Sequence, residues 1–118
     1  MRHNKNVDEL SEANEKEIVQ RITRNLLDIQ LLRIIQAQPL TWGYRIKKQV
    51  ERDFNIKLRH GALYPMLNSL EQRGFLASRK QQEGGRARKA YTLTQEGGRF
   101  LQSYYTILVE QLKSSDGN

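Results

Sequence analysis

The sequence predicts a mainly α-helical domain with one small β-hairpin, and residues 58–94 carry most of that prediction. The first half of this stretch is helical, because apolar residues recur at intervals of three and four: Leu63, Met66, Leu67 and Leu70. The second half indicates two strands, residues 75–82 and 86–92, joined by a turn at residues 83–85. A helix followed at once by a basic two-stranded loop is the outline of a winged helix-turn-helix, which places the helix in a DNA major groove and the loop on the flanking backbone.

The composition favours a polyanionic partner. The 118 residues, enough for one domain, include 20 Lys and Arg against 13 Asp and Glu, which gives a net charge of +7. Such an excess favours double-stranded DNA over a membrane, although a soluble protein that is merely basic is the alternative. Cysteine is absent, which excludes a disulfide scaffold and a Cys-ligated zinc site. No apolar run reaches the ~18 residues of a membrane span and no signal peptide opens the chain, so we expect a cytoplasmic protein.

The first predicted helix covers residues 7–24 and has a thin apolar stripe that includes Leu10, Ile18 and Ile22. A helix with so little to bury needs another surface, such as a second subunit, to cover it. Residues 1–24 are therefore expected to form an N-terminal extension used in dimerisation.

The next two helices are expected at residues 25–38 and 42–54. The first is apolar on more than one face and should be central. Thr41 is the expected N-cap of the second. After it, Ile56 and Leu58 alternate with polar residues, which predicts a brief strand.

The helix at residues 59–73 contains Pro65, so its regular part should begin no earlier than about Gly61. Gly74 is the expected C-cap glycine. After the hairpin, Thr94 caps a last helix over residues 95–113. Residues 25–94 are thus the expected winged-helix DNA-binding domain, and residues 95–118 a C-terminal dimerisation helix and tail.

Apolar residues on the two terminal helices predict a homodimer interface, since a stripe spaced by three and four residues favours a partner helix. The expected interface residues are Leu10, Ile18, Ile22, Leu101, Tyr104, Leu108 and Leu112.

Three motifs together resemble the PadR family of transcriptional regulators. Residues 39–44 (PLTWGY) resemble the family's entry to its second core helix, residues 61–71 (GALYPMLNSLE) its recognition helix, and residues 84–97 its Gly-Gly wing followed by Arg-Lys-x-Tyr-x-Leu-Thr. The likeness covers roughly residues 26–101. Two departures alter the reading surface: Ala62 replaces the usual Thr, and Arg59-His60 stands where a small capping residue is common.

The resemblance implies a sequence-specific DNA-binding regulator, a repressor that binds a promoter inverted repeat as a homodimer. Larger members sense aromatic compounds at the dimer interface, and Phe100, Tyr104 and Tyr105 could line such a place. An aromatic stripe on a helix is more often packing, so an effector is the less favoured interpretation. Trp42 could stack on a ligand or lie half-buried in the core.

The expected DNA contacts come from the polar face of the recognition helix and from the basic wing. They are Arg59, His60, Ala62, Tyr64, Asn68, Lys80, Arg86, Arg88 and Lys89. Along the second strand, alternation puts Arg86 and Arg88 on one side and Lys89 and Tyr91 on the other. The plainer interpretation is a solvated helix face and a basic edge that prevents aggregation.

Two other functions remain open from the sequence: a winged helix that docks protein, and an architectural protein indifferent to DNA sequence. No catalytic constellation is present, so we do not expect an enzyme. We expect no metal, because His3 and His60 are the only histidines and no acid cluster accompanies them. We expect no cofactor either, because no phosphate-binding glycine loop is present.

Overall fold

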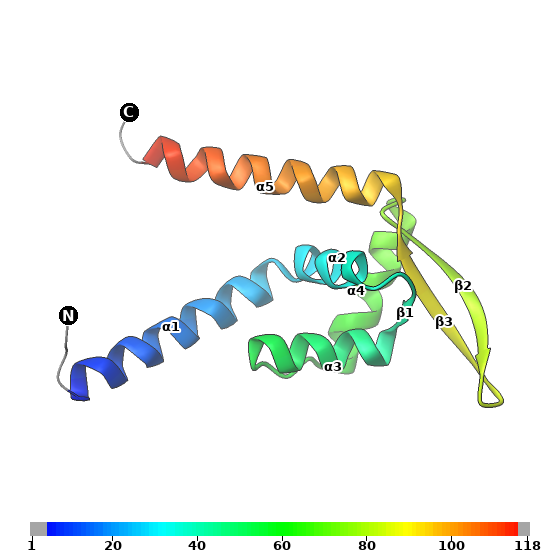
Figure 1. The fold of residues 1–118 in the computed structure, drawn as a ribbon, viewed down its shortest axis with the longest axis horizontal. Coiled ribbons are helices and arrows are strands. Elements are labelled where there is room, and N and C mark those ends of the chain that lie inside the picture. The colour runs from blue at the N-terminus through cyan, green and yellow to red at the C-terminus, as the bar shows by residue number, and fades with distance from the viewer. Residues whose placement is uncertain (1–4, 116–118) are drawn as a thin grey trace.

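A computed structural model of the chain describes the backbone of residues 5–115 and the side chains at positions 9, 11–59, 61–82 and 84–113. Five helices and three strands follow one another over that range: α1 (Lys5–Asn25), α2 (Leu27–Ala37), β1 (Thr41–Trp42), α3 (Gly43–Phe54), α4 (His60–Gln72), β2 (Leu76–Glu83), β3 (Arg86–Leu93) and α5 (Gln95–Ser115). The prediction of a mainly α-helical winged helix-turn-helix with extra helices at both ends is confirmed. In Figure 1, α2, α3 and α4 form the centre, the β2–β3 hairpin lies on one side, and α1 and α5 extend away on the other.

The core lies where α2, α3 and α4 meet. Helix α2 is buried on several faces, as expected, and Leu31, Leu32 and Ile35 are almost fully enclosed. The recognition helix α4 adds the stripe that its spacing predicted, with Leu63, Leu67 and Leu70 at 0–1% exposure. Each such side chain contributes roughly 1.5–3 kcal/mol when buried, so this stripe fixes which face of α4 points outward.

Two local predictions are wrong. Thr41 does not cap α3; it forms β1 with Trp42, and the N-cap position of α3 belongs to Trp42, which makes no side-chain capping bond. Ile56 and Leu58 do not form a strand. Both are buried in the core within an irregular connection, where the backbone N–H of Leu58 donates to the Glu51 carboxylate at 2.9 Å. Ile56 and Leu58 alternate with exposed residues as strand residues do, but no strand of the described chain lies beside them to pair with, so the pattern gave a wrong prediction.

The three strands form an antiparallel sheet in the order β1-β3-β2. The hairpin turn is tighter than predicted, because Glu83 belongs to β2 and pairs with Arg86, which leaves only Gly84 and Gly85 in the turn. Both glycines have positive φ, 58° and 78°. A two-residue turn of this kind suits the right-handed twist of a hairpin.

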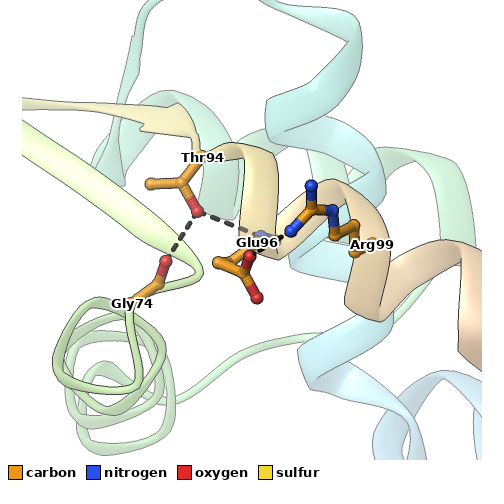
Figure 2. Close-up of polar contacts among 5 residues, drawn as sticks. Gly74, Thr94, Glu96 and Arg99 are labelled. Atoms are coloured by element: carbon orange, nitrogen blue, oxygen red, sulfur yellow. Dashed lines mark hydrogen bonds and ion pairs between the residues drawn. The ribbon is translucent and has the colours of Figure 1, made fainter.

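A compact joint connects α4, the wing and α5. Gly74 follows α4 with φ 86°, as its predicted C-cap role requires. The Thr94 hydroxyl donates to the Gly74 carbonyl at 2.6 Å and accepts from the Gly97 backbone N–H at 3.0 Å, which confirms the predicted cap (Figure 2). Gly97 is required for close packing, because a Cβ there would lie 2.2 Å from the carbonyl oxygen of Phe75.

Candidate nucleic-acid interface

Helix α4 presents a polar face away from the core. Opposite its buried leucines, Ala62, Tyr64 and Asn68 are exposed, and Arg59 is exposed at the N-cap position. The side chain of His60 lies outside the described residues. The predicted reading residues whose side chains are described are therefore exposed and available to a ligand.

Gly43 permits the position of Tyr64. A Cβ at Gly43 would lie 2.5 Å from Cε1 and 2.9 Å from the hydroxyl of Tyr64. The first residue of α3 therefore lies directly against the ring from α4. The contact between Gly43 and Tyr64 therefore brings the start of α3 close to the first half of α4, on the surface that also faces the wing.

A polar cluster ties α4 to the wing. The Glu71 carboxylate accepts a hydrogen bond from the Ser78 hydroxyl and forms an ion pair with Lys89 Nζ at 3.0 Å. The bonds from Ser78 and Lys89 lower the pKa of Glu71 below its usual value. The carboxylate in turn raises the pKa of Lys89. Lys89 is therefore held toward α4, and it is less free to reach a ligand than the sequence suggested.

The sheet register separates the basic residues of β3 as their alternation predicts. Trp42 pairs with Ala90, so Trp42, Arg86 and Arg88 share one side of the sheet. Lys89 and Tyr91 share the other, where Lys89 Nζ lies 5.7 Å from the Tyr91 ring centroid. Burial raises the pKa of the Tyr91 hydroxyl.

A cleft of about 480 Å³ opens between the start of α3, the polar face of α4 and β3. Aromatic side chains and cations line it together, including Trp42, Tyr44, Tyr64, Arg86 and Arg88. The cleft thus brings predicted DNA contacts of the wing together with Tyr64 and Asn68, which are predicted contacts of the helix. Lys80 is exposed on β2 and borders a second cleft, which it shares with Arg88 and Lys89. Arg88 and Lys89 line the first cleft as well.

Trp42, Tyr44 and Arg45 belong to this surface but were not among the predicted contacts. Tyr44 is 60% exposed, and the Arg45 guanidinium carbon lies 4.7 Å from the Trp42 ring centroid. Their local pattern indicated only the start of a helix. What brings them here is the pairing of β1 with β3, which joins residues about fifty positions apart and leaves no local signal.

The predicted dimer residues fall into different environments. Ile18, Ile22, Leu108 and Leu112 are between 39% and 69% exposed on α1 and α5. Leu101 was assigned wrongly: it is 1% exposed because it packs into the core of its own chain. Tyr104 is half-buried and packs edge-on against Phe100. The side chain of Leu10 lies outside the described residues.

The aromatic residues considered for an effector pack mainly against one another. The rings of Phe75 and Phe100 stack at 4.3 Å between centroids, and Tyr105 alone among the three considered is exposed, at 37%. Packing therefore accounts for Phe100 and Tyr104. No group of three or more acidic, His or Cys side chains that could hold a metal occurs among the side chains that the structure describes. Within the described residues, none of the helices has the length and apolar character needed to cross a membrane.

Comparison with known proteins identifies the family. The model of the transcriptional regulator PadR-like family matches residues 31–103, which is more than half of the chain. The chain belongs to the PadR-like family of transcriptional regulators. This membership confirms the expectation that it is not an enzyme. A search of curated protein sequences finds no significant match.

Several solved structures resemble this PadR-like chain. A PadR-like transcription factor from Bacteroides fragilis superposes with a TM-score of 0.71 over 85% of this chain and 96% of its own, and at 20% identity it shows the fold alone. A PadR family transcriptional regulator from Eggerthella lenta is 25% identical, with a TM-score of 0.66 over 92% of this chain and 97% of its own. Bacillus subtilis PadR, solved in complex with operator DNA, is 25% identical, with a TM-score of 0.61 over 68% of this chain and 47% of its own.

Proposed function

We propose that this PadR-like protein binds double-stranded DNA in a sequence-specific manner and represses transcription by covering a promoter. The observation that carries the proposal is the cleft in which Tyr64 and Asn68 of α4 meet Arg86 and Arg88 of the wing. In a winged helix, the exposed face of α4 reads base edges while the wing holds phosphates. The net charge of +7 and the operator complex of Bacillus subtilis PadR support it.

The proposed binding unit is a homodimer formed by residues 1–24 and 95–118, with residues 25–94 contacting DNA. Support comes from large apolar side chains that the single chain leaves exposed on α1 and α5: Ile18, Val19, Ile22, Tyr105, Ile107, Leu108, Val109 and Leu112. Burying such residues between two copies removes apolar area from water and stabilises association. Two-fold symmetry then presents two α4 helices to major grooves about 34 Å apart, on an inverted repeat.

The test is a selection of bound sequences from a random duplex pool at physiological salt. Enrichment of an inverted repeat is the expected result. Binding without enrichment would instead indicate an architectural protein, and no binding to any duplex would indicate a protein-docking module; either result contradicts the proposal.

Salt dependence supplies a second test on the enriched duplex. Each phosphate contact lowers the slope of log K against log salt by ~0.9. Arg86→Gln should therefore flatten the slope by about that amount. Arg33→Gln is the matched control, because Arg33 is exposed on α2, outside the proposed interfaces. Among the side chains that the structure describes, its guanidinium donates to Gln30 at 3.1 Å and has no acidic partner. Equal slopes in the two variants would contradict a phosphate contact by the wing.

A further inference from the structure

Two arginines from distant parts of the chain share one tryptophan ring. The guanidinium carbon of Arg45, in the first turn of α3, lies 4.7 Å from the Trp42 ring centroid. That of Arg88, on β3, lies 4.9 Å from the same centroid. The β1–β3 pairing creates this arrangement, because Trp42 lies opposite Ala90 and therefore on the Arg88 side of the sheet.

The guanidinium groups of Arg45 and Arg88 pack on the Trp42 ring, and their charges are not paired with a carboxylate among the described side chains. Among the described side chains, the ion pairs involve Arg21, Lys89 and Arg99, and neither Arg45 nor Arg88 has an acidic partner. A guanidinium that packs on an aromatic ring keeps its N–H donors available at its edge, and those donors match the oxygens of a phosphate. Lys89 differs, because its charge is already paired with Glu71.

The start of α3 adds positive potential at the same place. Trp42 occupies the N-cap position and no side chain caps the helix there. The free backbone N–H groups of a helix N-terminus favour an anion. Trp42 and Arg88 also border the cleft that Tyr64 and Asn68 of α4 enter, so an anion bound here would lie next to the proposed reading face.

We propose that Arg45, Trp42 and Arg88 form a phosphate clamp in which both arginines bind the DNA backbone and Trp42 is a positioning residue that holds them. This inference rests on the proposed DNA binding and deepens it, because it adds Arg45 and Trp42 to the binding surface. The ring contributes no charge. It reduces the freedom that each arginine loses on binding and keeps the two donors close together.

The main test compares Trp42→Leu with Trp42→Tyr on the duplex enriched by selection. Leucine keeps an apolar side chain but removes the aromatic face, whereas tyrosine retains a face. The restraint from each cation–π contact at an exposed site corresponds to about two- to five-fold in binding, so Trp42→Leu, which removes both, should weaken binding about five- to thirty-fold. It should also flatten the salt slope by roughly 1 to 2, although no charge is removed, because both arginines lose their positions. Trp42→Tyr should restore most of both quantities.

The arginine variants check the clamp without disturbing the core, since Arg45 is exposed and Arg88 half-buried. Arg45→Gln and Arg88→Gln should each flatten the salt slope by ~0.9, and Arg33→Gln should not. A Trp42→Leu variant that binds with the parent's affinity and slope would overturn the proposal. So would equal losses in the Leu and Tyr variants, because packing alone would then explain them.

A readout without DNA separates the clamp from the proposed function. Trp42 is the single tryptophan of the chain, so its emission reports on this site alone. Titration with inorganic pyrophosphate should change that emission saturably in the parent and not in Arg45→Gln or Arg88→Gln. A pyrophosphate response in a protein that binds no duplex would show that the three residues bind phosphate, and it would refute DNA binding. Duplex binding that is unchanged by Trp42→Leu would support the proposed DNA binding and refute the clamp.

Discussion

Glu71 is the residue whose substitution best tests how the wing is fixed to the recognition helix. Glu71→Gln keeps the shape of the side chain and removes its charge. The hydrogen bond from Ser78 then becomes a neutral one, which costs about 1 kcal/mol relative to a charged acceptor. The ion pair with Lys89 adds only ~0.2–1 kcal/mol, because the two side chains are 50% and 30% exposed and solvent screens them. We expect the free energy of unfolding to fall by about 1–2 kcal/mol at pH 7, and the melting temperature by roughly 4–8 °C.

The pH dependence gives the same prediction a sign. The pKa of Glu71 is lowered from 4.5 in the folded chain, so its contribution is present above that value and is lost as pH falls through the folded pKa. The difference in free energy of unfolding between the parent and Glu71→Gln should therefore become smaller at acid pH. Lys89 has a raised pKa, so its contribution is present below 10.5 and is lost as pH rises above it.

The assay is thermal and urea unfolding followed by circular dichroism at neutral and acid pH. Glu96→Gln is the matched control, because its ion pair with Arg99 has both side chains more than 60% exposed and should contribute little. A Glu71→Gln variant as stable as the parent at pH 7, or a difference that persists unchanged in acid, would refute the reasoning.

Three further predictions follow from the core, the joint and the terminal helices. Leu67→Ala should lower the free energy of unfolding, measured by chemical denaturation, by about 2–5 kcal/mol, because its site is fully enclosed. A loss below about 1 kcal/mol would contradict tight packing at this site. Gly97→Ala should lower stability by roughly 1–3 kcal/mol through overpacking against backbone, whereas Gly98→Ala, whose Cβ would meet only a Leu93 methyl at 3.9 Å, should be neutral or slightly stabilising in the same assay. Ile22→Glu should convert a dimer to a monomer in sedimentation while the helical signal stays unchanged; an unaltered sedimentation profile would place the interface elsewhere.

The recognition helix and hairpin were predictable because their signals are local. The leucine spacing of α4, the Gly84-Gly85 turn and the Thr94 cap each depend on residues within one or two turns of chain. The β1 strand was not predictable in this way. Two residues carry no period, and their partner strand lies far along the sequence.

The DNA contacts predicted from the sequence were limited in the same way, because the side chains that support them come from distant parts of the chain. Alternation along β3 correctly separated Arg88 from Lys89, but it gave no hint that Glu71 would engage the lysine or that Trp42 would support the arginine. Leu101 matched the stripe of α5 equally well as a core or an interface residue. Periodicity identifies an apolar face without saying which molecule covers it.

The joint at Gly74, Thr94 and Gly97, together with the burial of Leu101 in the core, anchors the start of α5, and the rest of the helix extends away from that anchor. The 21 residues of α5 extend about 31 Å at 1.5 Å per residue. The part that follows Leu101 extends about 21 Å, so a change of 10° in its direction would displace the far end by roughly 4 Å. Because Thr94 bonds to Gly74 directly after α4, a change in the direction of α5 at this joint would also change the angle between α5 and α4. In the proposed dimer, the way in which the distal half of α5 docks would therefore influence the angle at which α4 meets DNA.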